Sequence, residues 1–547
     1  MNLPKLSAAV LCLIVSARTS YAAESSAPPD TVLFNGKVFT ADASHPQVEG
    51  LAIRGDRIIA TGESATIRAL SGPHTRLVDL AGHTVIPGIN DAHQHLSVTP
   101  PALIELQLKS RDPPWPEVRA AIQAAARSAG PEQGIFATIG PTVLEDNDAR
   151  RIALDQLAPD RPVILATFST YVFILNSAAL RQFGIREDEP DPLGGSYDRS
   201  PDGRLNGVAR GYAAMAILRK QASLTLTDEA VRQLRKILNE NARFGITTLQ
   251  DMADGGGGEQ ALDLLTRVPT PIRVRIMRMP LTSPTEPDLR EGRSLPVTPA
   301  PLIRVSGTKW KLDGNPFDGP RDQPVHPGDP QLWALSLMFP PPELEWMLRQ
   351  SIKYHDQLIL HVSGTPAARA MLNAMEATGG AEMWRNRRVR FEHGDGILPS
   401  FIPRLRALGI IVVQNPTHLD LGALRTRYQL DSSQPLRSLL AAGIPVALGS
   451  DGPVNPYLNL ARACTDPDRP GESLTREQAV RAYTLTSAYA EMLENDKGSI
   501  TKGKLADLAV LSQDIFAVPV EQLPSTVSVL TMVGGAIVYD AHVLTLR

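Results

Sequence analysis

Short runs of alternating apolar and polar residues mark both ends of the chain. Asn35-Gly36 and Gly55-Asp56 separate the first runs as hairpin turns. The runs are residues 31–34, 37–40, 51–54 and 57–60 near the amino terminus, and 505–511, 527–533 and 536–539 near the carboxyl terminus. We therefore expect residues 24–80 and 491–547 to build one small composite β-sandwich.

Between these ends, apolar runs alternate with helical stretches, which is the pattern of a parallel α/β domain. The helical stretches include residues 229–244, 343–355 and 366–378. Besides the apolar run before His93, the candidate strands are residues 162–167, 246–250, 304–309, 358–361, 389–393, 410–414 and 446–451. Eight such strands predict a (β/α)8 TIM-type barrel over residues 81–490.

The segment from about residue 100 to 230 is too long for a single strand–helix unit of such a barrel. It contains stretches rich in Pro, Gly and Asp, such as residues 188–195. We expect part of it to be an insertion near the mouth of the site.

The first 23 residues have the pattern of a secretory leader. Lys5 precedes an apolar run over residues 6–17, and residues 20–23 offer small-residue cleavage sites. The run is shorter than the roughly 20 residues that a spanning helix needs. We expect a cleaved signal peptide over residues 1–23, an exported protein that is periplasmic or secreted, and no membrane anchor in the mature chain.

Composition narrows the choice of partner. The chain has 547 residues, is 43% hydrophobic and 21% charged, and carries a formal net charge of −3. Both signs are scattered along it, so no basic stripe indicates nucleic acid, and a small molecule is the favoured partner. The sequence leaves the oligomeric state open, a homo-oligomer included. After cleavage of the leader, Cys464 is the only cysteine, which excludes an intramolecular disulfide.

The chemistry begins with His93 and His95, one residue apart at the end of an apolar run. Side chains alternate faces on an extended segment, so both imidazoles point to one side and can bind one metal ion. The pair alone is equally consistent with an ordinary polar strand end. Other candidate strands end on comparable residues, and the strand ends of a barrel meet at one face. These residues are Lys309, His361, His393 and Asp451.

Nitrogen and oxygen donors of this kind suit zinc, manganese, iron or cobalt. Two ions fit if one residue bridges them. The convergence of several strand ends therefore predicts a divalent metal centre at the mouth of the barrel.

Several segments of the chain resemble the amidohydrolase superfamily, in particular the branch related to N-substituted formamide deformylase. The matching segments are residues 85–95, 175–180, 307–314, 361–364, 390–393, 448–454, 481–486 and 497–508. Their order is specific, and they cover nearly all of the mature chain. The resemblance implies a metal-dependent hydrolase that cleaves an amide-type C–N bond in an N-acyl or N-formyl amide of a small organic molecule.

The resemblance also implies a ligand set for two divalent ions, with zinc as the expected metal. The ligands would be His93, His95 and Asp451 for the more buried ion, and His361 and His393 for the second. Asp451 would act on the attacking water as general base and later, as general acid, on the leaving amine.

Lys309 would bridge the two ions. An ammonium cannot bind a cation, so this role requires the neutral amine to take up carbon dioxide and become a carbamate. A buried lysine readily becomes neutral, which makes the reaction reasonable. The alternative is that Lys309 pairs with Asp313 or with the substrate.

Two positions depart from the superfamily pattern. Tyr171 stands where relatives commonly carry a histidine, and Thr365 where they commonly carry an aspartate. A tyrosine can donate a hydrogen bond to a carbonyl oxygen but does not bind metal or shuttle protons near pH 7 as imidazole does. We assign Tyr171, Thr365 and His418 to substrate binding, although an ordinary surface histidine explains His418 equally well.

Other functions stay open at this point. Ester, lactone or carbamate hydrolysis would use the same centre. Deamination of a heterocycle is less favoured, because such enzymes usually place a glutamate three residues after the strand-five histidine, whereas Val362-Ser363-Gly364 follows His361. A non-catalytic binding protein is disfavoured because all six candidate metal and catalytic positions are present.

Overall fold

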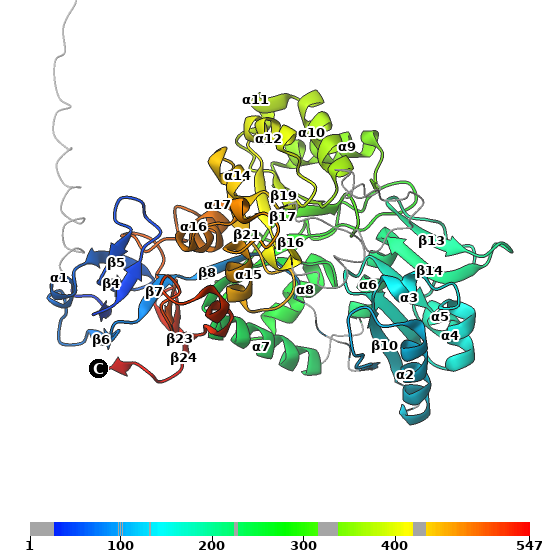
Figure 1. Cartoon of the computed structure of the whole chain (residues 1–547), viewed down its shortest axis with the longest axis horizontal. Helices are drawn as coiled ribbons and strands as arrows, with labels where there is room; N and C mark the ends of the chain where they lie inside the picture. The colour runs from blue at the N-terminus through cyan, green and yellow to red at the C-terminus, as the bar shows by residue number, and fades with distance from the viewer. Residues whose placement is uncertain are drawn as a thin grey trace, which may run out of the picture.

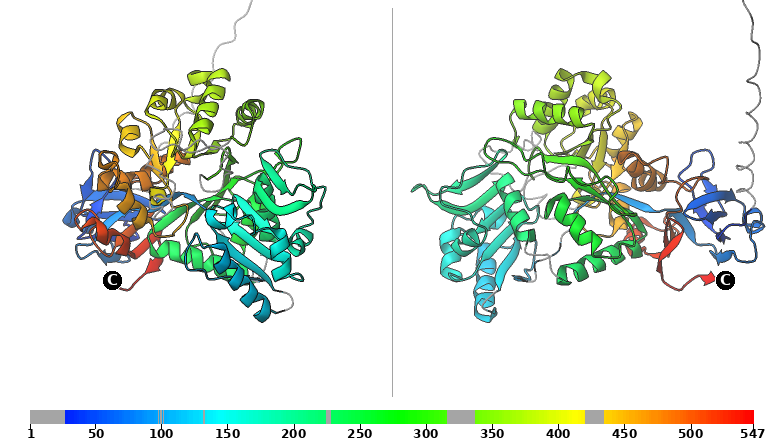
Figure 2. Two further views of the ribbon diagram at one scale, coloured as in Figure 1. Left: turned by 45° about the vertical axis from the view of Figure 1, so that its right-hand side comes forward. Right: turned by 180° about the vertical axis from the view of Figure 1, so that it is seen from behind.

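Figure 1 shows a molecule of three parts, a β-sandwich, a central barrel and an inserted domain, with the barrel in the middle. The other two parts stay on opposite sides of the barrel in both views of Figure 2. The computed structural model describes residues 27–96, 98, 100, 102–130, 133–223, 228–315, 337–419 and 434–547. The predicted signal peptide, residues 1–23, lies outside the described residues.

The central sheet has eight parallel strands, which confirms the predicted α/β class and (β/α)8 barrel. In sheet order they are β8 (Ile89–Gln94), β15 (Ile246–Met252), β16 (Arg273–Arg278), β17 (Ile303–Lys311), β18 (Leu358–Val362), β19 (Arg390–His393), β20 (Ile411–Gln414) and β21 (Val446–Leu448). Just beyond β21, the Asp451 backbone N–H donates to the His93 carbonyl oxygen at 2.9 Å. This bond joins the last strand to the first.

One of the eight predicted barrel strands was wrong, and one barrel strand was missed. Residues 162–167 form β11 (Val163–Thr167), which belongs to the inserted sheet, and the missing barrel strand is β16. β11 is apolar and fully buried, so its composition is that of a barrel strand. β16 carries three arginines, and one of them, Arg275, is buried because the side chains of Gln250 and Gln357 accept its hydrogen bonds.

The apolar run before His93 is also divided between two sheets. Residues 84–87 form β7 (Thr84–Pro87), which pairs with strands of the sandwich, and the barrel strand β8 begins only at Ile89. Gly88 lies between them, where a Cβ atom would meet Thr247 Oγ1 at 2.1 Å. The chain therefore passes directly from the sandwich into the barrel strand that carries His93.

Helices cover the outside of the barrel, and the three helical stretches predicted between its strands are present. α7 (Asp228–Arg243) illustrates the reason, since it buries Ala230, Leu234, Leu238 and Ala242 on one stripe. The others are α8 (Gly257–Thr266), α9 (Pro341–Tyr354), α10 (Thr365–Ala377), α11 (Gly380–Trp384), α12 (Ile402–Leu408), α14 (Leu436–Ala441), α15 (Pro456–Ala463), α16 (Arg476–Arg481) and α17 (Ser487–Ala490), with short helices η3 (Pro399–Phe401), η4 (Pro416–Leu419), η5 (Pro470–Glu472), η6 (Ala482–Thr486) and η7 (Val520–Ser525). Among the described residues, no helix is long and apolar enough to cross a bilayer.

The inserted domain follows β8 and has its own six-stranded sheet and hydrophobic clusters. In sheet order its strands are β13 (Gly195–Arg199), β14 (Leu205–Gly211), β12 (Val172–Leu175), β11, β10 (Gly134–Ile139) and β9 (Leu103–Glu105). Its helices are α2 (Trp115–Ser128), α3 (Pro141–Glu145), α4 (Arg151–Leu157), α5 (Ser177–Gln182) and α6 (Tyr212–Ala222). The buried Asn176 caps α5 by accepting from the Ala179 N–H at 2.9 Å.

Strands from both chain ends form two sheets that share one core, as predicted for the sandwich. Leu33, Leu51, Val85, Leu508 and Leu530 meet in this core. In sheet order, the first sheet contains β25 (Thr545–Leu546), β6 (Arg76–Asp79), β1 (Thr31–Phe34), β4 (Gly50–Arg54) and β5 (Arg57–Gly62). The helix α1 (Ser64–Arg68) packs against this sheet. The second sheet contains β24 (Ala536–Asp540), β23 (Ser528–Val533), β22 (Leu508–Leu511), β7, β2 (Lys37–Phe39) and β3 (Gln47–Val48).

Candidate metal centre

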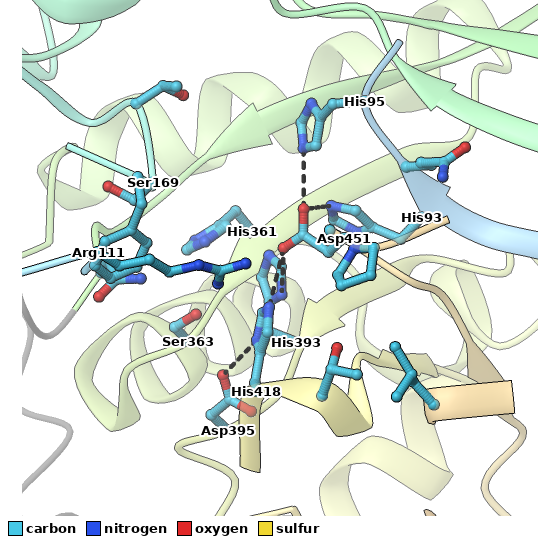
Figure 3. A pocket seen from close by; sticks show the side chains of 18 of the residues that line it. His93, His95, Arg111, Ser169, His361, Ser363, His393, Asp395, His418 and Asp451 are labelled. Atoms are coloured by element: carbon cyan, nitrogen blue, oxygen red, sulfur yellow. Dashed lines mark ion pairs between the residues drawn. The ribbon is translucent and has the colours of Figure 1, made fainter. Parts of the chain in front are cut away.

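The predicted metal-binding side chains line one cavity of about 1100 Å³ at the carboxyl ends of the barrel strands. His93 belongs to β8, Lys309 to β17, His361 to β18 and His393 to β19. His95 and Asp451 come just after the ends of β8 and β21. Figure 3 shows the four histidines around the carboxylate of Asp451.

Asp451 lies at the centre of this cluster. Its Oδ1 is 3.3 Å from His95 Nε2 and 3.6 Å from His93 Nε2. One potential ligand atom each from His93, His393 and Asp451 fall within 4.8 Å of one another. Atoms at these separations can bind one cation placed between them.

The backbone at these ligands is held in unusual conformations. Asp451 has φ 43° and His393 has φ 70°, in the left-handed region that costs free energy for a residue with a side chain. The buried carboxylate of Asp91 accepts the backbone N–H groups of His93 at 3.2 Å and Ser450 at 2.9 Å. Asp91 therefore fixes the two chain segments that carry the ligands relative to each other.

Each histidine of the cluster donates from Nδ1 to an acceptor outside it. A carboxylate or carbonyl at one ring nitrogen fixes the tautomer and leaves the other nitrogen available as a metal ligand. The acceptors are Glu392 for His93 at 2.6 Å, Asp313 for His361 at 2.7 Å, Asn415 for His393 at 2.9 Å, and Asp254 and the Met252 carbonyl for His95 at 3.1 Å. The cluster thus has the outer contacts of a metal centre.

Glu392 connects the centre to the interior of the barrel. Its carboxylate also accepts from the buried Arg390 at 2.7 and 3.1 Å, and Arg390 donates to Gln250 at 2.5 Å. Burial opposes the charge of Glu392, yet Arg390 and Lys309 lower the pKa of its carboxyl well below the usual range. Glu392 is therefore ionised and can orient His93 at neutral pH.

Lys309 has the surroundings that its predicted carbamate requires. Its side chain is buried, and Nζ has no hydrogen-bond partner among the described residues. Burial lowers the pKa of this amine to about 8, so a substantial fraction is neutral near physiological pH. Asp313, the alternative partner, instead binds His361 and the backbone N–H groups of Ser363 and Gly364.

The pKa values of the histidines divide the cluster into two groups. Burial lowers the pKa of His93 to about 4 and also lowers those of His361 and His393, which favours the neutral imidazoles that bind metals. Burial opposes protonation of His95 and His418 too, but neighbouring carboxylates outweigh it and raise both pKa values to about 10. In the ion-free protein these two imidazolium groups compensate the charge of Asp451.

The three residues assigned to substrate binding lie in different surroundings. Tyr171 and His418 line the cavity, with His418 Nε2 3.2 Å from Asp451 Oδ2. The Tyr171 hydroxyl is buried without a hydrogen-bond partner among the described residues, and its ring centroid is 5.3 Å from that of His361. Thr365 begins α10, donates to the Gly396 carbonyl at 2.9 Å and lines a separate pocket between α9 and α10 rather than the metal cavity.

Sequence patterns alone did not identify the residues that hold the histidines. Glu392 and Asp313 occur within matched segments, but a carboxylate in a buried strand gives no indication of which histidine it will face. Asp254 and Arg111 also line the cavity. Arg111 comes from the inserted domain, and no local pattern marks its position.

A parallel barrel with a histidine and aspartate cluster at its carboxyl-terminal mouth defines a metal-dependent hydrolase. Residues 76–539 match the amidohydrolase family, and the chain belongs to this family. It is a metal-dependent amidohydrolase, an enzyme that hydrolyses C–N bonds other than peptide bonds.

Several known proteins are similar to this chain. N-substituted formamide deformylase of Arthrobacter pascens is 27% identical over 93% of this chain and 98% of its own length. An uncharacterized metal-dependent hydrolase from Pyrococcus horikoshii OT3 has the same fold, with a TM-score of 0.63 and 19% identity over 90% of this chain and 99% of that chain. A variant of atrazine chlorohydrolase from Arthrobacter aurescens TC1, complexed with zinc and atraton, matches with a TM-score of 0.50 and 18% identity over 93% of this chain and 95% of that chain.

Proposed function

We propose that this enzyme hydrolyses the amide-type C–N bond of a small N-acyl or N-formyl amide. The observation that carries the proposal is the convergence on a single cavity of five side chains with nitrogen or oxygen donors and of one buried amine without a hydrogen-bond partner in the described part of the chain. The donors would hold two divalent ions, with zinc first and manganese, iron or cobalt as alternatives. The ligands would be His93, His95 and Asp451 for one ion and His361 and His393 for the other, with Lys309 between them as a carbamate.

Divalent ions at these donors would lower the pKa of a bound water toward about 7 and polarise the substrate carbonyl. Asp451 is placed to move the proton. Burial opposes its charge, but His93 and its other neighbours hold the pKa of its carboxyl well below the usual range, so it is an ionised acceptor. Its carboxylate can take a proton from the attacking water and later deliver it to the nitrogen of the leaving amine.

Tyr171 and His418, which both line the cavity, would orient the substrate. The Tyr171 hydroxyl lacks a partner among the described residues, and a substrate carbonyl oxygen would supply the missing acceptor. His418 is oriented by Asp451 and, at 3.9 Å from its other nitrogen, by Asp395. Thr365 would act less directly, through the position of α10 and the adjoining Ser363.

We also propose that the protein is exported and loses residues 1–23. The support is the apolar run over residues 6–17 followed by small residues. Mass spectrometry of the amino terminus after expression in a host with a secretion pathway tests this proposal, and an intact leader on exported protein would contradict it.

A substrate panel tests the proposed reaction. We expect the zinc-loaded full-length enzyme to hydrolyse N-formyl and N-acetyl anilides faster than the matched phenyl esters, and Asp451→Asn to lose this activity. Faster turnover of the esters throughout the panel would replace amide by ester hydrolysis. A chain that purifies without metal and gains no activity on metal addition would reject the hydrolase proposal itself.

A further inference from the structure

Arg111 is a cavity residue to which the proposed reaction gives no role. It lies in the loop between β9 and α2, so the inserted domain and not the barrel brings it to the cavity. In Figure 3 its guanidinium extends toward His361 and the carboxylate of Asp451. It has no hydrogen bond or ion pair with any residue that the structure describes.

The other lysine and arginine side chains of the lining have interaction partners or are assigned to the metal centre. Lys311 Nζ lies 3.7 Å from Asp254 Oδ2 and 4.3 Å from the centroid of the Tyr171 ring. Arg462 has an interaction partner of its own. Lys309 is assigned to the metal centre. Among the cations that line the cavity, Arg111 is therefore the one that has no counter-ion in the described part of the protein.

The size of the cavity indicates how much of the substrate lies beyond the scissile bond. About 1100 Å³ is slightly above the range of roughly 300–1,000 Å³ for pockets that bind whole small molecules. An N-formyl group occupies only a small part of this volume, so most of it is available for the rest of the substrate. Arg111 contacts that remaining space from the side of the insertion.

We infer that Arg111 binds an anionic group of the substrate, and that the substrate is an N-acyl or N-formyl compound carrying a carboxylate. Arg111 is exposed to solvent. Its planar guanidinium can donate two parallel hydrogen bonds to such a group, and a charge-assisted pair of this kind is stronger than neutral hydrogen bonds. This inference rests on the proposed function and narrows its substrate class. Arg111 acts on specificity and takes no part in bond cleavage.

The test compares substrates that differ only in charge. N-formyl-4-aminobenzoate is anionic, N-formyl-4-toluidine is neutral, and N-formyl-4-aminobenzylamine is cationic. We expect the wild-type enzyme to prefer the benzoate over the toluidine by about tenfold or more in kcat/KM. Arg111→Gln should remove this preference through KM, with little change in kcat and no change for the toluidine.

Arg119→Gln is the matched control, because Arg119 is an exposed arginine of the same inserted domain that does not line the cavity. This variant should keep the wild-type preference. Equal losses on all three substrates in Arg111→Gln would assign Arg111 a structural role and overturn the inference. A wild-type preference for the cationic substrate would also overturn it.

A binding measurement separates this inference from the proposed reaction. If the wild-type enzyme cleaves none of the three compounds, the proposed reaction fails for this class. Calorimetry with N-formyl-4-aminobenzoate then still decides the role of Arg111. Binding that is about tenfold weaker in Arg111→Gln but unchanged in Arg119→Gln supports an anion site, and equal binding in all three proteins rejects it.

Discussion

The residue that best distinguishes this site from an ordinary polar cluster is Lys309. A buried histidine or carboxylate usually finds a partner, and those of the cluster do, but the Lys309 amine has none among the described residues. Such a group lowers stability unless it loses its charge or gains a ligand. The proposed carbamate removes the ammonium charge, and the anion that forms would be compensated by the metal ions that it binds.

Lys309→Met should therefore separate stability from activity. In the metal-free protein the folded-state pKa of about 8 is below the ordinary value of 10.5, so the unfolded chain binds more protons between these values. The free energy of unfolding should rise with pH across this window in the wild type, and this component should be absent in Lys309→Met. Near pH 8 the variant should be about 1–3 kcal/mol more stable, although it loses bound metal and activity.

Urea unfolding at pH 8 and pH 10 with chelator, together with metal analysis, provides the measurement. Lys502→Met is the control, because Lys502 is an exposed lysine in the turn before β22. The same pH slope in Lys309→Met as in the wild type would contradict a buried, depressed amine.

Tyr171→Phe removes only the hydroxyl that has no hydrogen-bond partner among the described residues. If this hydroxyl donates to the carbonyl oxygen, kcat should fall by about 10²-fold, the usual loss for one such donor. Metal content and the unfolding midpoint should stay unchanged. Tyr197→Phe, in the inserted domain but outside the cavity lining, is the control. Unchanged kcat in Tyr171→Phe would leave the tyrosine as a packing residue.

At the scale of elements, the contact between β21 and β8 determines where Asp451 lies. Gly449 follows β21, and a Cβ atom there would be 2.4 Å from His93 Cβ and 2.6 Å from His93 N. Only glycine allows the last strand to approach the first this closely. Barrel closure and the position of the central carboxylate therefore depend on one residue.

Gly449→Ala should destabilise the protein by about 1–3 kcal/mol, as overpacking does, and should lower metal content by moving Asp451 away from His93. Gly471→Ala is the control, because no atom of the residues that the structure describes lies within 4 Å of a Cβ atom at that position. Calorimetry and metal analysis of both variants provide the measurement. A Gly449→Ala protein with normal stability and metal content would show that the segment after β21 adapts without moving its ligand.

The elements also show how far the sequence alone could predict this structure. Strands that end on His361, His393 and Asp451 could be found because an apolar run stops at a polar ligand. β16 could not, because the partners that allow Arg275 to be buried come from other strands. Likewise, β11 matched a barrel strand in composition, and only its pairing with β10 and β12 places it in the inserted sheet.

At the scale of the whole molecule, the barrel and the sandwich share one large hydrophobic cluster, whereas the main cluster of the inserted domain is separate. The largest hydrophobic cluster joins barrel residues such as Ile276 to sandwich residues such as Ile86 and Val533. The main cluster of the inserted domain, which contains Ile135 and Val163, is separate. Metal binding at the barrel mouth should therefore stabilise the barrel and the sandwich, and the inserted domain much less.

Metal removal tests this division. A ligand that binds only the folded state adds about 2.7 kcal/mol of stability at 100 times its dissociation constant. Hydrogen exchange of the zinc-loaded enzyme should show slower exchange than the chelated enzyme in β8, β18, β19 and β22, with little change in β10 and β11. Asp451→Asn should show no such difference, since it removes the ligand at the centre of the cluster. Equal slowing in β10 and β11 would mean that the inserted domain unfolds together with the barrel. The position of Arg111, which this domain carries, would then depend on the metal as well.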